Sequence, residues 1–344
     1  AIAIPPNNDV DVFANDIGLI AIIENNTLKG FNIAIGGGLS TTHGNPETYP
    51  RLATVIGFTN SEEKTLSAVY EILTVQRDYG NRSDRKLARL KYTVDRLGIE
   101  AFKKEVERRT GFIMENERPY YFHSRGDYYG WEQNHEGLWY YTVFVENGRV
   151  LDDEHISLKS GLLEVAKTGK ATFRFTANQN VIISDIQPGD KEKVDIILRK
   201  YKIIEHTDNA SPVRKNAMAC VAFPTCPLAL AEAQRYMPSL VTKIEGLLDK
   251  FQLADEAIII RMTGCPNGCA RSYLAEVGFV GTALGKYNMH LGGDHEGKRL
   301  NKIYKESVEE GEILHELEIL FSSFKHEKAM DEKFGDYVIR KQFV

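Results

Sequence analysis

The stretches ACVAFPTC (219–226) and TGCPNGC (263–269) decide how this chain is organised, because they hold all four of its cysteines. Five residues separate Cys220 from Cys226, and three separate Cys265 from Cys269. Four thiolates are the ligand set of a [4Fe–4S] cluster. The pattern therefore predicts one shared metal centre that draws two distant parts of the chain together.

The residues between the last two cysteines support this interpretation. Pro266 and Gly268 allow a tight turn, and the amide N–H groups of such a turn can point at cluster sulfurs. Donors of this kind raise the reduction potential of a cluster. The sequence CPNGC is thus typical of a segment that wraps an iron–sulfur centre.

Other roles for the four thiols are less favoured. Disulfides are unexpected, because nothing resembling a signal peptide precedes the cysteines. A chain of 344 residues can also bury a large core without covalent cross-links. Structural zinc is the stronger alternative, although zinc pairs are usually spaced by about two to four residues. Four unconnected buried cysteines would have to fall into pairs by chance. Spacing alone therefore favours iron–sulfur and leaves zinc open.

The composition restricts the class of protein. Hydrophobic residues make up 42% and charged residues 26%, which is the ordinary globular range, and the length predicts about two or three domains. A net charge of −5 does not indicate the basic surface that binding to nucleic acid requires. No apolar run approaches the ~18–20 residues of a membrane helix. We expect neither nucleic acid nor membrane as a partner. Low cysteine use is typical of a reducing compartment such as the cytoplasm.

The first part of the chain reads as a hairpin followed by helices. The strands LIAII (19–23) and FNIAI (31–35) flank a turn at Glu24-Asn25-Asn26. Helical periodicity then predicts helices over residues 61–80 and 83–98, each closing on glycine. Ser61 gives only a partial capping box, because Lys64 stands where Glu or Gln would complete it.

The rest of the chain predicts a second and a third unit. A strand over 138–145, a helix over 157–169, a hairpin over 172–185 and a helix over 190–201 have the order of a ferredoxin-like half-domain. A helix over 227–251 and a strand over 257–262 then separate the two cysteine pairs. The fold class is α+β, with mixed sheets and flanking helices. The expected domains are 1–128, 129–203 and 204–344.

At this point a family resemblance is visible. The runs MACVAFPTCPLALAEAQRYMPS, IIIRMTGCPNGCARSYLAEVGFVG and KYNMHLGG resemble the cluster-binding half of assimilatory sulfite reductase haemoproteins, in the sulfite and nitrite reductase superfamily. The resemblance continues through HSRGDYYGW (123–131), FVENGRVLD (144–152), FRFTANQNVII (173–183), YGNRSDRKLARLKYT (79–93) and FNIAIGGGLSTTHGN (31–45). It covers nearly the whole chain.

The resemblance implies cofactors and an activity. Cys220, Cys226, Cys265 and Cys269 would hold a [4Fe–4S] cluster, and Cys269 would also ligate the iron of a sirohaem. The implied reaction is the six-electron reduction of sulfite to sulfide in sulfate assimilation, with electrons from a flavoprotein reductase or a ferredoxin. A nitrite reductase of the same superfamily, or a non-catalytic iron–sulfur or zinc module, stays open as an alternative.

The resemblance also implies a repeat. FNIAIGGG and YNMHLGGD share an aromatic-Asn-x-x-x-Gly-Gly pattern at Phe31 and Tyr287. The family is built from two related repeats, so the half-domain is expected to lie between two such units.

Sirohaem carries many carboxylates, so its pocket needs cations and amide donors. Arg82 and Arg85 lie in a basic segment that suits bidentate pairing, although a solvated helix face explains them equally well. Arg125, Asn178 and Gln179 resemble the cofactor-facing positions of the family, with a plain hairpin turn as the alternative for Asn178. Asn267 lies where its amide could reach cluster or haem. His43 and His290 are weaker candidates for proton transfer.

The beginning of the chain suggests a further partner. The start AIAIPPNNDVD has no methionine and reads as part of a strand. In the resembling family an anion-binding Lys-x-Lys precedes such a stretch, and an earlier half supplies arginines. We therefore expect an N-terminal half of the haemoprotein to complete the site.

Overall fold

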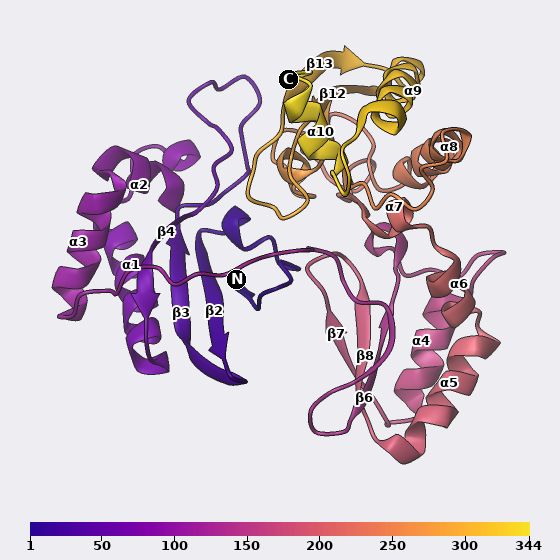
Figure 1. Cartoon of the computed structure of the whole chain (residues 1–344), viewed down its shortest axis with the longest axis horizontal. Coiled ribbons are helices and arrows are strands. Elements are labelled where there is room, and N and C mark those ends of the chain that lie inside the picture. The colour runs from indigo at the N-terminus through magenta and orange to yellow at the C-terminus, as the bar shows by residue number, and fades with distance from the viewer.

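The computed structural model describes residues 1–344, and it places them in three α+β parts, each built on its own sheet (Figure 1). The sheet orders are β1-β2-β3-β4, β5-β6-β8-β7 and β13-β12-β11-β10-β9. The strands are β1 (Ile2–Ala3), β2 (Ile17–Glu24), β3 (Thr27–Ile35), β4 (Thr54–Thr59), β5 (Gly130–Gln133), β6 (Trp139–Val143), β7 (Thr172–Phe175), β8 (Val181–Ile186), β9 (Ala217–Ala219), β10 (Ile260–Thr263), β11 (Val277–Ala283), β12 (Lys286–Leu291) and β13 (Lys302–Val308).

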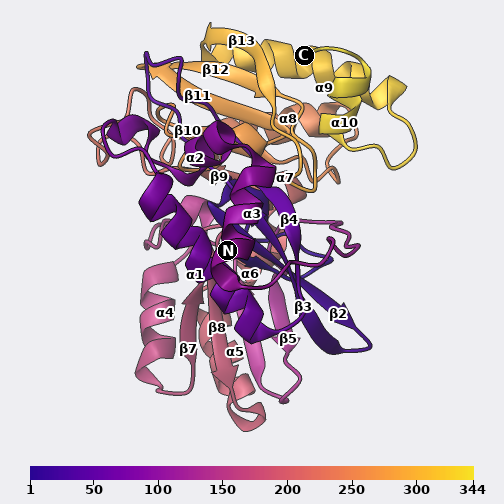
Figure 2. The same ribbon diagram turned by 90° about the vertical axis from the view of Figure 1, so that its left-hand side faces the viewer.

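Helices flank each sheet, and the predicted α+β class is confirmed. The α-helices are α1 (Glu62–Tyr79), α2 (Leu90–Leu97), α3 (Ile99–Thr110), α4 (Leu158–Lys167), α5 (Lys191–Lys200), α6 (Ile203–Asn209), α7 (Pro212–Lys215), α8 (Met237–Lys250), α9 (Glu310–Glu327) and α10 (Phe334–Arg340). The 3-10 helices are η1 (Val12–Ala14), η2 (Arg85–Leu87), η3 (Glu146–Gly148), η4 (Pro188–Asp190) and η5 (Ser272–Leu274). Figure 2 shows the C-terminal part lying across the other two.

The hairpin in the first sheet forms as predicted. Asn25 and Asn26 take φ of 51° and 57°, the left-handed pair that a two-residue turn with the twist of the strands requires. Helix α1 is also confirmed: the Ser61 hydroxyl accepts from the Lys64 N–H, and the helix stops before Gly80. The residues therefore determine these elements locally.

The predicted helix over 83–98 is wrong in its first half. The Asp84 side chain caps a single 3-10 turn, and Arg89 takes an extended conformation with ψ of 156° before α2 starts at Leu90. This break lets the Arg89 guanidinium pair with Asp16 at 2.7 Å. The Asp84 cap and the contact of Arg89 with Asp16 replace the continuous helix that the local periodicity predicts.

The half-domain has the predicted order of elements and one addition. Strand β5 precedes the predicted β6, and it pairs with β6 from Gln133 opposite Trp139 to Gly130 opposite Thr142. The buried core of this part lies between its sheet and helices α4 to α6. It holds the hairpin β7–β8 rigidly, and this hairpin carries Asn178 and Gln179.

The predicted helix over 227–251 is also wrong at its start, because α8 begins only at Met237. The N–H groups of Leu230 and Ala231 donate instead to the Gly264 carbonyl, at 2.7 and 3.0 Å. These bonds tie the segment after the first cysteine pair to the second pair. The C-terminal part has the largest buried core, with 29 residues against 14 in the half-domain. The hydrogen bonds between the two cysteine segments therefore lie on a well-packed part of the protein.

The first and last sheets share one arrangement. In the first, β1 runs parallel to β2, which continues antiparallel to β3 and β4; in the last, β10, β11, β12 and β13 follow the same scheme. A left-handed residue precedes the 3-10 helix in each, Asp11 with φ of 46° and Arg271 with φ of 57°. The faint similarity in sequence therefore reflects a structural repeat.

We expect Gly37→Ala to lower the free energy of unfolding by about 1–3 kcal/mol. An added Cβ would lie 2.3 Å from the Phe13 carbonyl oxygen and 2.4 Å from that of Asn15, so the backbone would have to move. Urea denaturation measures the effect. Gly311→Ala in α9 is the matched control, since nothing lies within 4 Å of its added Cβ. Equal stabilities for the two variants would contradict the prediction.

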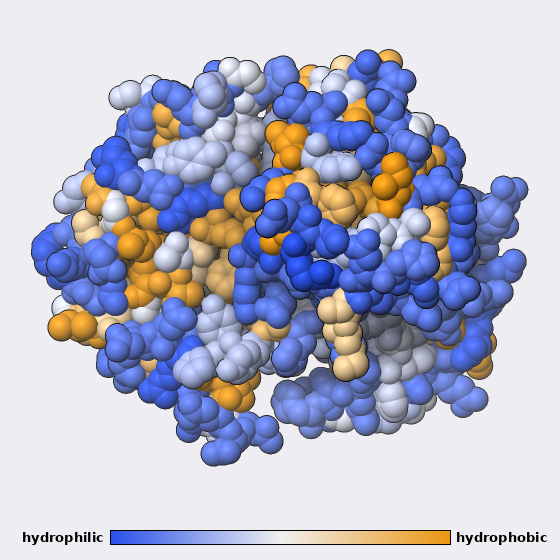
Figure 3. Space-filling model, turned by 45° about the horizontal axis from the view of Figure 1, so that its top comes forward, coloured by the Kyte–Doolittle hydropathy of each residue, from blue (hydrophilic) through white to orange (hydrophobic).

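The surface is mostly hydrophilic on the face seen in Figure 3, with apolar side chains in separate patches. None of the helices is both long enough and apolar enough to cross a membrane.

Candidate metal centre

The two cysteine pairs follow two adjacent strands. Strands β9 and β10 run parallel, with Ala219 opposite Met262, so their carboxyl ends lie at one edge of the sheet. Cys220 comes directly after β9, and Cys265 lies two residues after β10. The Gly264 N–H donates to the Cys220 sulfur at 3.2 Å. The fold therefore brings the two pairs together at this edge.

The four thiols differ in access to solvent. Cys265 is buried, Cys220 and Cys226 are half-buried, and Cys269 is exposed. Although Cys269 is exposed, partial burial of its thiol raises the pKa, and the nearby Cys265 and Cys226 raise it further. Burial also raises the pKa of Cys220. The hydrogen bond from the Gly264 N–H lowers this pKa, whereas the nearby Cys269 and Cys265 raise it further. Each pair thus lies within electrostatic reach of the other, and one sulfur remains accessible to a further group.

The spacing of these side chains separates two kinds of metal centre. No three His, Cys, Asp or Glu side chains lie close enough together to hold a single metal ion. A zinc ion would need its sulfurs only about 3.8 Å apart, as follows from Zn–S bonds of about 2.3 Å. A [4Fe–4S] cube lies between its four cysteines and keeps their sulfurs farther apart. The four thiols therefore form no ready-made site for a single ion such as zinc.

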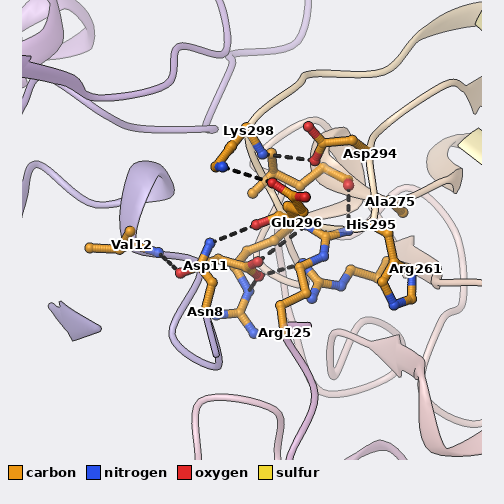
Figure 4. A network of polar contacts seen from close by, with 12 residues as sticks. Asn8, Asp11, Val12, Arg125, Arg261, Ala275, Asp294, His295, Glu296 and Lys298 are labelled. Carbon is orange, nitrogen blue, oxygen red and sulfur yellow. Dashed lines mark hydrogen bonds and ion pairs between the residues drawn. The ribbon is translucent and has the colours of Figure 1, made fainter. Parts of the chain in front are cut away.

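A buried charge cluster is centred on Asp11, and Figure 4 shows this residue with Arg125 and Arg261. The Asp11 carboxylate contacts Arg261 at 2.6 Å, Arg271 at 3.0 Å and Arg125 at 3.2 Å. Burial opposes ionisation of Asp11, but the attraction of the three guanidinium groups outweighs it and holds the pKa well below its usual range. Arg271 follows Cys269 by two residues. The cluster therefore fixes the second cysteine loop against the first sheet.

Asp11 was not recognised from sequence. Its closest partner, Arg261, is 250 positions away, and neither residue belongs to a recognisable motif. Burial lowers the pKa of Arg261 to about 9, with Asp11 opposing that effect, so the guanidinium stays charged at neutral pH. Only the left-handed backbone of Asp11 and Arg271, one in each repeat, marks these positions as special.

The hairpin residues proposed for cofactor binding reach both cysteine pairs. The Gln179 amide donates to the carbonyl of Ala219, the residue before Cys220, at 2.9 Å. The Asn178 oxygen accepts from Arg271 at 3.2 Å, and its amide donates to the Asp9 carbonyl at 3.0 Å. These two side chains therefore connect the half-domain to the metal centre.

The proposed arginines lie in different places. Arg125 is buried and engaged with Asp11 and with the Leu274 carbonyl, at 2.6 Å. Arg82 and Arg85 are exposed, and Arg82 donates to the Arg77 carbonyl at 3.0 Å. The structure does not bring these last two to the cysteines.

A small cavity lies beside the second cysteine loop. It has a volume of about 200 Å³, and its lining includes Asn267, Arg271, Arg89 and Ser40. Two guanidinium groups and an amide are suitable partners for the carboxylates of a tetrapyrrole. The cavity is smaller than a whole sirohaem, but these side chains suit the carboxylates at the edge of one. Of the two histidines considered, His290 is buried, which lowers its pKa to about 4 and keeps its ring neutral.

Comparison with known proteins shows what the chain is similar to. The family described as nitrite and sulphite reductase 4Fe-4S domain matches residues 1–114, and the nitrite/sulfite reductase ferredoxin-like half domain matches residues 131–201. A sulfite reductase (NADPH) hemoprotein beta-component of Leptospira biflexa serovar Patoc is 60% identical over 340 residues, which are 99% of this chain and 61% of that protein. The protein of the same name from Geobacillus thermodenitrificans is 52% identical over 343 residues, 100% of this chain and 60% of that protein.

A solved structure has the same fold. The Mycobacterium tuberculosis NirA protein superposes with a TM-score of 0.81 at 26% identity, over 98% of this chain and 62% of that chain. The chain thus spans about 60% of the length of the curated relatives it matches. The matching family is described as a 4Fe-4S domain, and the relatives are named as hemoproteins. By sequence and by fold, this chain belongs to the nitrite and sulfite reductase family.

Proposed function

We propose that this chain is the cluster-binding part of a sulfite reductase haemoprotein, which reduces sulfite to sulfide by six electrons. One observation carries the proposal: the two cysteine pairs follow the carboxyl ends of the adjacent parallel strands β9 and β10. Cys220, Cys226, Cys265 and Cys269 would hold the [4Fe–4S] cluster. Cys269 would also ligate the sirohaem iron, a role that its exposure supports.

The chain's own residues provide the surroundings of both groups. Asn267 and Arg271 line the cavity that suits the sirohaem carboxylates, and Gln179 braces the strand end that carries Cys220. Together the two cofactors would supply single-electron transfers, which a six-electron reduction requires. A thiolate shared by cluster and haem would couple them through bonds.

The names of the relatives favour sulfite over nitrite as the substrate. They also specify NADPH, so a flavoprotein reductase is the expected electron donor, with a ferredoxin as the alternative. We place the remaining anion-binding groups on a segment equivalent to the part of the relatives that this chain does not match. We assign the protein to sulfate assimilation in a reducing compartment, the cytoplasm, in keeping with its few cysteines.

Iron and acid-labile sulfide analysis with a visible spectrum tests the proposal. The purified chain is reconstituted without oxygen, first with iron and sulfide and then with sirohaem added. We expect about four irons per chain for the cluster and about five with sirohaem. A Soret band should appear only after the second addition. Fewer than about one iron per chain, or stoichiometric zinc in its place, would refute the proposal.

A further inference from the structure

The carbonyl oxygen of Pro266, inside the CPNGC turn, lies against the loop that follows β3. It accepts from the Thr41 N–H at 3.1 Å, and the hydroxyls of Thr41 and Tyr273 each lie 3.0 Å away. The two hydroxyls are 3.3 Å apart. In Figure 1 the loop after β3 rises from the first sheet toward the C-terminal part. The first repeat thus contacts the turn that carries two of the metal ligands.

These three donors exceed what one carbonyl can accept, because its oxygen has two lone pairs. The Thr41 N–H fills one of them. Either hydroxyl can fill the other: Tyr273 can donate while Thr41 donates to Tyr273, or Thr41 can donate directly. The two side chains are therefore partly redundant, and the carbonyl keeps its direction while either hydroxyl is present.

Both sides of this contact are held firmly. Tyr273 is buried, its ring packs edge-on against His290 at 5.4 Å, and an added Cβ on Gly268 would lie 2.9 Å from it. The loop that delivers Thr41 is tied down by the buried Lys91 ammonium, which donates to the carbonyls of Ser40 at 2.8 Å and Gly38 at 3.0 Å. The turn is thus held by rigid elements of both repeats.

The direction of this carbonyl determines the direction of the next amide. The peptide bond between Pro266 and Asn267 is trans, so the Asn267 N–H points opposite to the Pro266 oxygen. Pro266 lines a groove together with Thr41 and Tyr273, whereas Asn267 lines the other cavity with Arg271. The Asn267 N–H has no acceptor within the protein. It is a free donor that points away from the clamp.

We infer that Thr41 and Tyr273 are positioning residues, which hold the Asn267 N–H as a hydrogen-bond donor to the metal centre and so raise its reduction potential. The inference rests on the proposed [4Fe–4S] cluster and goes beyond it. An N–H donor stabilises the more negative, reduced state of a cluster, so a fixed donor shifts the potential upward. We call Thr41, Tyr273 and the Pro266 carbonyl the turn clamp.

The test measures the cluster potential of the reconstituted full chain by redox titration with EPR detection. Tyr273→Phe and Thr41→Val alone should change it little, because one hydroxyl remains. The double variant should favour the oxidised cluster by roughly tenfold, a downward shift of ~59 mV for one electron. In the Tyr273→Phe background, Thr41→Ser should keep the potential of the single variant, since it retains the hydroxyl. Tyr337→Phe is the matched control, a buried tyrosine whose hydroxyl pairs with Ser323 at 2.6 Å.

The outcomes are distinguishable. Loss of iron in every protein, wild type included, would refute the cluster itself. Full iron content with one potential across all variants would refute the turn clamp and leave the cluster standing. A shift that Thr41→Ser fails to prevent would also refute it, because the effect would then follow from packing and not from the hydroxyl.

Discussion

Asp11→Asn is expected to lower the free energy of unfolding by about 3–5 kcal/mol, the cost of breaking a buried ion pair by removing one partner. Asp11 is the only acidic side chain paired with Arg261, Arg271 and Arg125. The side chains of Arg125 and Arg261 are 1% and 4% exposed, so water cannot replace the lost charge. Equilibrium urea denaturation at pH 7 measures the effect.

The pKa of Asp11 determines how the stability difference between wild type and Asp11→Asn depends on pH. The folded-state pKa of Asp11 is depressed, so its contribution to stability is fully present above the unfolded value of about 3.9 and is lost as the pH falls through the folded pKa. The stability difference between wild type and Asp11→Asn should therefore be constant from about pH 5 to 8. This stability difference should become smaller only below about pH 4.

Asp16→Asn is the matched control. Asp16 pairs with Arg89 at 2.7 Å, but the two side chains are 48% and 37% exposed. Such a pair contributes about 0–1 kcal/mol. Similar losses for the two variants would show that the Asp11 cluster is not the buried centre that its geometry indicates.

Cys265→Ser is expected to reduce the iron content of the reconstituted chain from about four per chain to nearly none, because a cube needs all four of its ligands. Cys265 is the most buried of the four thiols, and the serine hydroxyl that replaces it is a much weaker ligand for cluster iron than a thiolate. Iron and sulfide analysis with the visible spectrum gives the result. The fold should persist, since the core of the C-terminal part lies mainly in its helices and strands.

Thr225→Ala is the control for this variant. Thr225 is exposed in the first cysteine loop, beside Cys226, and its hydroxyl has no hydrogen-bond partner in the structure. Its iron content should equal that of the wild type. If Cys265→Ser kept a full complement of iron, the four-cysteine assignment would fail.

Much of the local structure followed from the sequence. The Asn25-Asn26 turn and the Ser61 cap are short-range features, and the structure has both where they were predicted. Two helices were predicted too long, over 83–98 and 227–251. In both cases the periodic pattern was real, but long-range contacts, from Arg89 to Asp16 and from Leu230 to Gly264, stand where the helix was predicted.

The sequence by itself predicted the ligand set, because the type and spacing of four cysteines restrict the metal chemistry before any fold is known. Only the tertiary structure decided what surrounds them. Asp11 meets Arg261 across 250 positions, and Thr41 meets Pro266 across 225. Such contacts carry no periodicity or motif, because they arise from the packing of two whole repeats against each other. Which side chains can act as ligands depends on their chemistry, which the sequence gives directly. How those side chains are oriented depends on neighbours that are distant in the sequence and meet only in the folded protein.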